Sequence, residues 1–458
     1  MQTMRTLSSL REALDSGALS SVALVEQMLK RARDPAGEGA RCFVKLYTDS
    51  ALAQAHAFDE CRRAGLTSAQ LGPLAGIPIS IKDLFDIEGE VTAAGSIVLR
   101  DNPPAKRDGP AMRRLRQAGA IFIGRTNMTE WAYGAVGLNG HFGTPRSAWD
   151  RDVDGGAGRI PGGSTSGGAV SVTDGMAAAT IGSDTGGSVR IPAAISGLAG
   201  FKPTARRVPL EGAYPLSRLD SIGPLAPSVA DCVLLDAILS GADGAHSMPT
   251  RALDGVRFGL SRKMLQDTLD DAIARPFERA LSALSAAGAR IVEFDWDELD
   301  EYAAINAKGG FSAAECHARH KNVLATRSGE IDPWVVVRVG PGAAQSATDY
   351  IELTNARASW IERSSARLSA FDALIAPTVP VVAPRIKPIM DDIASLGEYF
   401  KANAAVLRNC QLINFLDGCG LTIPIHEPGN APAGLMIAGP AMSDMQVLGI
   451  GVAVEALL

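Results

Sequence analysis

Two glycine-serine clusters lie in the middle of this chain of 458 residues, with their key serines 24 positions apart. The first, GGSTSGG, contains Ser164, and the second, DTGGSVR, contains Ser188. The consecutive glycines Gly186 and Gly187 allow successive backbone N–H groups to turn toward one point, where they could stabilise an oxyanion. The pattern therefore indicates acyl transfer, and the residues alone leave a tight structural turn as the alternative.

A serine hydroxyl is a weak nucleophile at neutral pH and needs a neighbouring base. None of the six histidines stands in a context that pairs it with either serine, so we interpret them as surface or core residues. Lys82 follows the apolar run Ile77 to Ile81, which should end inside the fold. Burial lowers the pKa of a lysine and so makes it a candidate base. The structural alternative is an ordinary lysine paired with Asp83 at the end of a strand.

Other catalytic or ligand-binding motifs are missing from the chain. There is no GxxxxGK, no GxGxxG that opens a helix after a strand, and no HExxH, which excludes the common phosphate, dinucleotide and zinc-protease sites. The serine motifs GxSxG and SxxK are absent as well. The six cysteines form no CxxC pair and no cluster with histidine, so we expect neither a zinc site nor a disulfide framework.

Composition and charge favour a soluble, folded protein. Hydrophobic residues make up 46% of the chain and charged residues 21%, close to globular averages. The net charge of -6, without a run of five like charges, offers no electrostatic footprint for nucleic acid or an anionic membrane. The N-terminal segment carries charges where a signal peptide would be apolar. We therefore expect a cytoplasmic protein with reduced thiols and a small-molecule partner.

The elements that must position these residues alternate between helices and strands. Apolar residues at helical spacing predict a helix that starts at a Ser21 cap and ends before Pro35. Short β-branched runs predict buried strands at 77–81 and 121–123, and Ser228 is the predicted cap of a later helix. This alternation predicts an α/β fold with a mixed central sheet surrounded by helices.

We treat residues 1–458 as a single domain with two functional regions. Residues 70–240 contain the glycine-serine signature and form the predicted catalytic core. Helical patterns replace the signature in residues 244–365, which we expect to shape substrate specificity. Two apolar runs, within 371–384 and 412–425, predict further strands of the main sheet.

The chemistry-bearing residues lie in stretches that together resemble the amidase signature family. The stretches span roughly residues 74–439 in the family's order: GIPISIKDLFD, GRTNMTEWA, PGGSTSGGA, GSDTGGSVRIPA, GLAGFKPT, IGPLAPSVAD, LIAPTVP and GLMIAGP. The resemblance implies a Ser-cisSer-Lys triad, with Ser188 as nucleophile, Ser164 as bridging serine and Lys82 as base. It also implies a cis peptide bond between Gly163 and Ser164, and neither a metal nor an organic cofactor.

Further site residues follow from the same resemblance and its neighbourhood. The backbone amides of Thr185, Gly186, Gly187 and Ser188 would form the oxyanion hole. Supporting hydrogen bonds are expected from Thr165, Asp184 and Arg190, and an acyl pocket could be lined by Met128, Trp131 and Tyr133, for which a plain core role is the alternative. Thr165 stands where the family usually has serine, and an apparent extension at 151–158 could alter access to the pocket.

Three functions are compatible with the resemblance. The leading one is a stand-alone amidase that hydrolyses the linear amide C–N bond of a small carboxamide, or a carbamate or urea derivative. The second is the catalytic A subunit of a tRNA-dependent glutamine amidotransferase. The third, a non-catalytic binding protein, is disfavoured because Lys82 and Ser188 are both present. The expected partner is a small amide rather than nucleic acid or a membrane, and a homodimer is one possible assembly.

Overall fold

A computed structural model describes residues 4–242, 251–265 and 269–458. Its strands form one mixed sheet of 11 strands in the order β1-β3-β2-β4-β6-β5-β10-β11-β9-β7-β8. The strands are β1 Phe43–Leu46, β2 Pro78–Lys82, β3 Ile121–Thr126, β4 Thr180–Asp184, β5 Ala199–Lys202, β6 Ser221–Ala226, β7 Arg257–Ser261, β8 Arg290–Phe294, β9 Ala373–Pro377, β10 Cys419–Pro424 and β11 Gly434–Gly439. The predicted α/β fold with a mixed sheet is confirmed, whereas residues 244–250 of the predicted variable region lie outside the described residues.

Strand β2, the third in this order, pairs in parallel with β3 on one side and with β4 on the other. The next pairings, from β4 through β6, β5, β10 and β11 to β9, are antiparallel. Because the carboxyl ends of parallel strands meet at one edge of a sheet, the residues that follow β2 and β4 are brought together. These are the segments that contain Lys82 and the DTGGSVR cluster.

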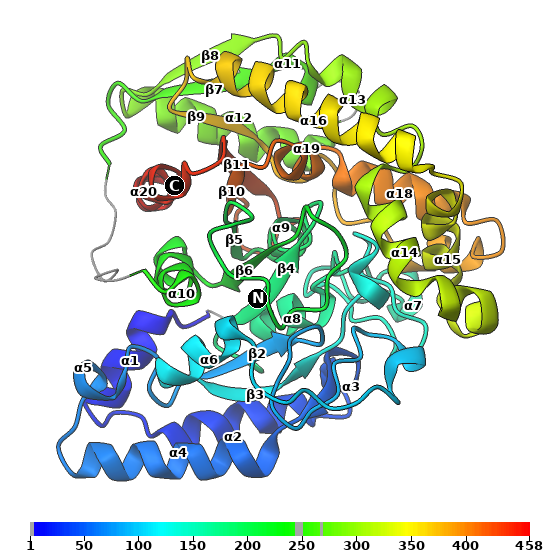
Figure 1. Ribbon diagram of the computed structural model, residues 1–458. Helices are drawn as coiled ribbons and strands as arrows, with labels where there is room; N and C mark the ends of the chain where they lie inside the picture. Colours follow the sequence, from blue (N-terminus) through cyan, green and yellow to red (C-terminus); the bar gives the residue numbers. More distant parts are fainter. Residues whose placement is uncertain (1–3, 243–250, 266–268) are drawn as a thin grey trace.

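Helices cover the sheet along its whole length (Figure 1). The α-helices are α1 Leu7–Asp15, α2 Ser21–Ala32, α3 Gly39–Cys42, α4 Thr48–Arg63, α5 Ser68–Leu71, α6 Pro110–Gln117, α7 Val153–Gly156, α8 Ser166–Thr173, α9 Arg190–Ser196, α10 Val229–Ser240, α11 Arg262–Leu265, α12 Asp271–Ala286, α13 Leu299–Ile305, α14 Gly310–Arg327, α15 Pro333–Val339, α16 Ala347–Leu368, α17 Ile386–Asp391, α18 Gly397–Leu407, α19 Cys410–Phe415 and α20 Asp444–Leu457. Helices α2 and α4 lie beside β3, and α12 and α16 lie at the opposite end beside β7 and β8.

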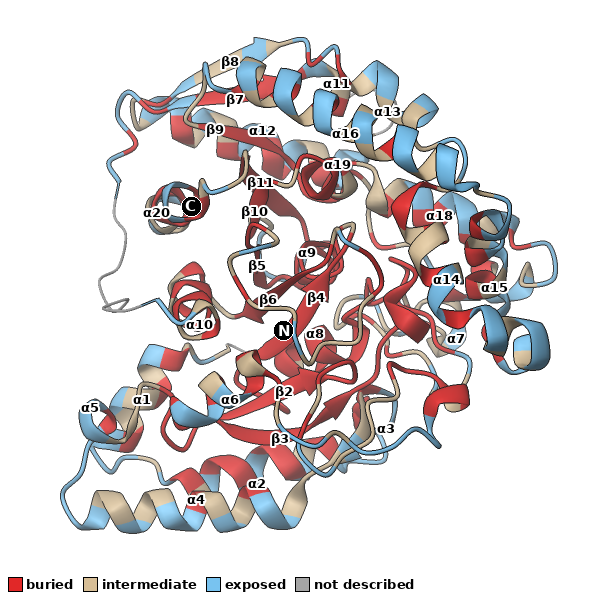
Figure 2. Ribbon diagram, viewed as in Figure 1, coloured by how far each residue is buried: buried red, intermediate tan, exposed pale blue. Residues whose placement is uncertain are grey.

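The hydrophobic core lies along the inner strands of the sheet. Every residue of β2, β3 and β4 is buried, and Figure 2 shows the exposed surface confined mainly to the outer faces of the peripheral helices. Strands buried on both faces read as continuous apolar runs, which explains why 77–81 and 121–123 could be recognised from the sequence. Among the described residues, none of the helices is long and apolar enough to cross a membrane.

Of the two predicted helix caps, one is confirmed and the other is displaced by one residue. Ser228 caps α10, because its side chain accepts from the Asp231 amide at 3.2 Å. The cap of α2 is Ser20 rather than Ser21: its hydroxyl accepts from the Ala23 amide at 3.0 Å, and Ser21 is already the first residue of the helix. A run of two serines offers two candidate caps, and only the backbone conformation distinguishes them. All six cysteines are unpaired thiols.

Candidate active site

The last residue of β2 is Lys82, whose side chain is completely buried. Its Nζ lies 2.7 Å from Ser164 Oγ and 2.9 Å from Ser183 Oγ. Burial lowers the pKa of Lys82 to about 7, against the opposing effect of the charges on Asp220 and Asp184. The amine is therefore available in its neutral, basic form near neutral pH.

Asp83 does not pair with Lys82. Its carboxylate accepts from Arg125 Nε at 2.7 Å and from the Gly95 amide at 3.0 Å. The side chains of Asp83 and Arg125 are both almost fully buried, so their charges compensate each other away from Lys82. This removes the structural alternative in which Lys82 is the partner of Asp83 at the strand end.

Ser164 follows a cis peptide bond with Gly163. The carbonyl oxygen of Ser164 accepts from the Thr129 amide at 3.1 Å, and the Gly163 amide donates to the Ala135 carbonyl at 2.7 Å. A Cβ at position 163 would lie 2.7 Å from the Gly137 backbone, so only glycine fits there. The loop around residues 129–137 thus holds the bridging serine by its main chain and leaves its hydroxyl directed at Lys82.

Ser188 lies in the loop between β4 and α9 and lines a cavity of about 260 Å³. Its carbonyl oxygen accepts from Thr165 Oγ1 at 2.6 Å. Thr165 therefore connects the two serine clusters, and a threonine hydroxyl serves where the family usually has serine. The hydroxyl of Ser188 takes part in no hydrogen bond with a described residue, so it is free to turn toward the cavity.

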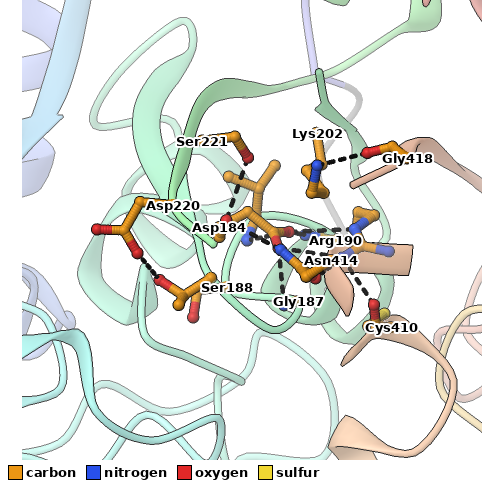
Figure 3. A network of polar contacts seen from close by, with 12 residues as sticks. Asp184, Gly187, Ser188, Arg190, Lys202, Asp220, Ser221, Cys410, Asn414 and Gly418 are labelled. Carbon is orange, nitrogen blue, oxygen red and sulfur yellow. Dashed lines mark hydrogen bonds and ion pairs between the residues drawn. The ribbon is translucent and has the colours of Figure 1, made fainter. Parts of the chain in front are cut away.

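The loop of Ser188 is attached to the buried carboxylate of Asp184. Arg190 donates to Asp184 through Nε at 3.1 Å and Nη2 at 3.0 Å, and Asn414 donates through Nδ2 at 2.9 Å. Figure 3 shows Asp184, Arg190 and Asn414 packed together behind the loop. Burial alone would raise the pKa of Asp184, but the charge and hydrogen bonds of Arg190 hold it well below its usual range. The carboxylate is thus a permanent acceptor for the loop.

One predicted oxyanion donor is engaged elsewhere. The Gly187 amide donates to Asp184 Oδ1 at 2.7 Å, and Gly187 does not line the cavity. Its φ of +131° and the 2.5 Å that would separate a Cβ from Ile191 Cδ1 give this glycine a structural role instead. The amides of Thr185, Gly186 and Ser188 make no hydrogen bond with a described residue, and these three residues do line the cavity. The assignment of Gly187 as a donor is therefore wrong.

Of the three predicted pocket residues, only Tyr133 lines the cavity. The Trp131 ring stacks on His320 with the ring centroids 3.7 Å apart, and it is buried. Met128 is also fully buried, with its Cγ against Gly95. These two residues belong to the core, as the alternative interpretation had it. Residues 151–158 are not among the residues that line the cavity, and an effect of this extension on access stays a prediction.

The later part of the chain supplies the wall opposite the serines. The lining residues from this part are Tyr302, Asn306, Gly309, Gly310, Phe311, Ser312, Arg338, Leu407, Gln411 and Phe415. Seven of these ten residues fall within 244–365, and the others come from α18 and α19. That this region shapes specificity stays a prediction.

The sequence did not reveal three further polar residues of the site. Ser183 is the second hydroxyl beside Lys82, and Asp220 accepts from Thr185 Oγ1 at 2.6 Å. Burial raises the pKa of Asp220 to about 6. Asn414 lies 230 residues from Asp184. Ser183 could have been found, because it shares the GSDTGG stretch. Asp220 stands in the mixed segment SRLDSI and Asn414 in the apolar segment LINFL, and neither segment is a motif.

The chain is similar to known amidases and amidotransferase subunits. The family model Amidase matches residues 23–448. The 2-amino-5-chloromuconic acid deaminase of Comamonas testosteroni is 34% identical over 85% of this chain and 83% of its own length. The A subunit of a glutamyl-tRNA(Gln) amidotransferase from Roseiflexus sp. (strain RS-1) is 32% identical over 97% of this chain and 95% of its own length. A crystal structure of an amidase superposes with a TM-score of 0.85 at 31% identity and covers 99% of this chain and 100% of that chain.

The match to the family model over nearly the whole chain and the similarity to amidases define a hydrolase of the amide C–N bond. The chain belongs to the amidase family, and its reaction is the cleavage of amide C–N bonds.

Proposed function

We propose that this protein is a stand-alone amidase that hydrolyses a small amide through the triad Ser188, Ser164 and Lys82. The observation that carries the proposal is the buried Lys82 amine, which lies 2.7 Å from Ser164 Oγ. The next residue, Thr165, donates to the carbonyl of Ser188, which lines the cavity. The described partners of the Lys82 amine are two serine hydroxyls rather than a carboxylate, and its function is then to exchange a proton with serine.

In the first half of the reaction, neutral Lys82 takes the proton of Ser164 as Ser164 takes the proton of Ser188. The Ser188 oxygen forms a bond to the amide carbon, and the carbonyl oxygen becomes an oxyanion near the free amides of Thr185, Gly186 and Ser188. Donors fixed in advance stabilise such developing charge strongly. The proton then returns through Ser164 to the leaving nitrogen, the C–N bond breaks, and an acyl-enzyme and ammonia or an amine are formed.

In the second half, water enters the cavity and loses its proton through the same relay. The resulting hydroxide bonds to the acyl carbon, the ester bond to Ser188 breaks, and the Ser188 oxygen takes the proton back. The carboxylic acid product leaves, and the enzyme returns to its starting state with Lys82 neutral. Each proton that enters the relay is returned, so no co-reactant other than water is consumed.

Ammonia release by the purified chain tests the stand-alone activity. We expect release from a panel of short aliphatic and aryl amides, carbamates and ureas without any added protein. The second candidate rests on the amidotransferase A subunits among the relatives. Ammonia release from none of the panel, followed by release from glutamine only when partner subunits and charged tRNA are supplied, would favour that candidate and overturn the first.

The proposed base predicts a particular pH profile. Lys82 is active when neutral, and its pKa is lowered to about 7, so kcat/KM should rise tenfold per pH unit below pH 7 and level off above it. Lys202→Met is a matched control, because Lys202 is also buried with its pKa lowered to about 8 but donates to the Pro203 and Gly418 carbonyls. This variant should keep the midpoint near 7. A midpoint near 10, the value of an exposed lysine, would contradict the assignment.

A further inference from the structure

The wall of the cavity contains a single charged group among the described residues. Arg338, in the last turn of α15, lines the same cavity as Ser188. The other described residues that line the cavity have aromatic, aliphatic or neutral hydrogen-bonding side chains, and none of them is an aspartate or a glutamate. A substrate that reaches Ser188 therefore meets one positive charge and no described negative charge.

The N–H groups of the Arg338 guanidinium have no hydrogen-bond or ion-pair partner among the described residues. No carboxylate of a described residue lies within ion-pair distance of it, and its Nε is buried without a hydrogen-bond acceptor. Arg338 is partly buried, and the two fully buried arginines differ from it because each has a carboxylate partner: Arg125 pairs with Asp83, and Arg190 pairs with Asp184. An arginine presents five N–H donors, and a buried donor without an acceptor lowers stability. Such an unsatisfied group at a binding site is typical of a side chain that awaits a ligand.

The position of Arg338 is nevertheless well determined. Its Cζ lies 4.7 Å from the ring centroid of Tyr133, and the Tyr133 hydroxyl donates to the Arg338 carbonyl at 3.1 Å. Stacking on an aromatic ring occupies the face of the guanidinium and leaves its N–H edge open for two parallel bonds to an anion. Tyr133 therefore orients the group without neutralising it.

The other end of helix α15 is connected to the loop around residues 129–137. The Asp332 amide donates to Glu130 Oε2 at 2.7 Å, and the Gly140 amide donates to the Asp332 carboxylate at 3.1 Å. Glu130 follows Thr129, whose amide holds the Ser164 carbonyl. The arginine and the bridging serine are thus attached to one loop, which maintains their separation. Fixed spacing between a binding group and the reacting atoms is what positions a substrate for attack.

We propose that Arg338 binds a carboxylate of the substrate, so that the natural substrate is a short amide that bears a carboxylate. This inference rests on the proposed amidase function and names its substrate class. A carboxylate matches the N–H edge of one guanidinium, and no second cation lines the cavity to balance a phosphate dianion. The cavity volume of about 260 Å³ limits the part of the substrate between its carboxylate and its amide to a few carbon atoms. Neutral groups such as Asn306 and Gln411 can pair with further polar atoms.

The test compares three monoamides, malonamate, succinamate and glutaramate, with the three corresponding diamides. Each pair differs only in whether the distal group is a carboxylate or a neutral carboxamide. For at least one chain length, kcat/KM should be about 100-fold higher for the carboxylate. Arg338→Gln should remove this preference, mainly through KM, and leave diamide hydrolysis within a few-fold of the wild type. Arg338→Lys should restore only part of it, because an ammonium lacks the paired edge.

A matched control variant is Arg319→Gln. Arg319 also lies over a tyrosine, with Cζ 5.8 Å from the Tyr214 ring centroid, but it does not line the cavity. This variant should keep the carboxylate preference. A wild-type preference below tenfold at every chain length, or equal losses on both substrates in Arg338→Gln, would overturn the inference. If Arg338→Gln does not fold, competitive inhibition of the wild type decides, because succinate or its homologues should inhibit and the neutral diols of equal length should not.

Failure of this inference can be distinguished from failure of the proposed function. If a fluorophosphonate labels Ser188 but none of the carboxylate-bearing amides is hydrolysed faster than its neutral counterpart, the substrate class is wrong and the triad stands. If Ser188 is not labelled and no amide is hydrolysed, the proposed function itself fails, and the inference fails with it.

Discussion

Lys82→Met is expected to abolish amide hydrolysis without weakening the fold. Methionine has a similar length and is apolar, so it suits the fully buried position. Without a base for the relay, kcat/KM should fall by roughly 10⁴-fold to 10⁶-fold, and fluorophosphonate labelling of Ser188 should become undetectable on the time scale of the wild-type reaction. The initial rate of ammonia release at substrate concentrations well below KM measures the fall in kcat/KM.

Although the activity of Lys82→Met should fall, its stability should increase. Because the pKa of Lys82 is lowered from 10.5 to about 7, folding at pH 6 buries a charged amine, whereas above pH 10.5 the amine is neutral in both states. Lys82→Met should therefore raise the urea midpoint most below pH 7, and the gain should disappear as the pH approaches 10.5. Lys45→Met, at a largely exposed lysine paired with Glu90, serves as control and should keep activity. Retention of more than a tenth of the activity by Lys82→Met would refute its role as base.

Arg190→Ala is expected to produce the largest loss of stability. Arg190 and Asp184 are both fully buried, and removal of one partner of a buried pair leaves an uncompensated charge, which costs about 3–5 kcal/mol. The Asp184 carboxylate would also lose its strongest donor while it still holds the loop of Ser188. Urea denaturation followed by tryptophan fluorescence measures the free energy of unfolding, and activity should fall together with it.

A surface ion pair provides the control for Arg190→Ala. Arg363 donates to Glu301 at 2.5 and 2.7 Å, but both side chains are nearly half exposed. Exposed pairs contribute little to stability, so Arg363→Ala should leave the unfolding transition in place. An unfolding midpoint for Arg190→Ala within error of the wild type would show that the buried pair does not hold the loop.

The sequence was sufficient for the parts of the fold that depend on local patterns. Buried strands such as β2 and β3 could be recognised because both faces are apolar, and Ser228 because a cap forms within one turn of its own helix. The order of strands in the sheet was not predictable. Pairing of β5 with β10, for example, joins residues more than 200 positions apart, and such contacts leave no trace in the spacing of either strand.

The residues of the candidate site also divide into those that the sequence reveals and those that only the structure reveals. Lys82, Ser164 and Ser188 stand in glycine-rich or apolar motifs whose composition needs an explanation, so they could be singled out. The role of Gly187 was misjudged because a free amide and a bonded amide have the same sequence, and only the position of Asp184 decides between them. Arg338 was missed for a related reason: the role proposed for it depends on the lack of an acidic neighbour among the described residues, which becomes visible only when the surrounding elements are in place.

The attachment of the Ser188 loop to one carboxylate has a consequence for how this protein could change its substrate. On that side of the cavity, Asp184 holds the amides of Gly187 and Val189 together with Arg190, so a substitution there would disturb folding and turnover at once. The facing wall, built from α13, α14, α15 and α19, holds none of the triad. Substitutions on this wall can therefore change which substrate fits, without disturbing the buried carboxylate that holds the Ser188 loop.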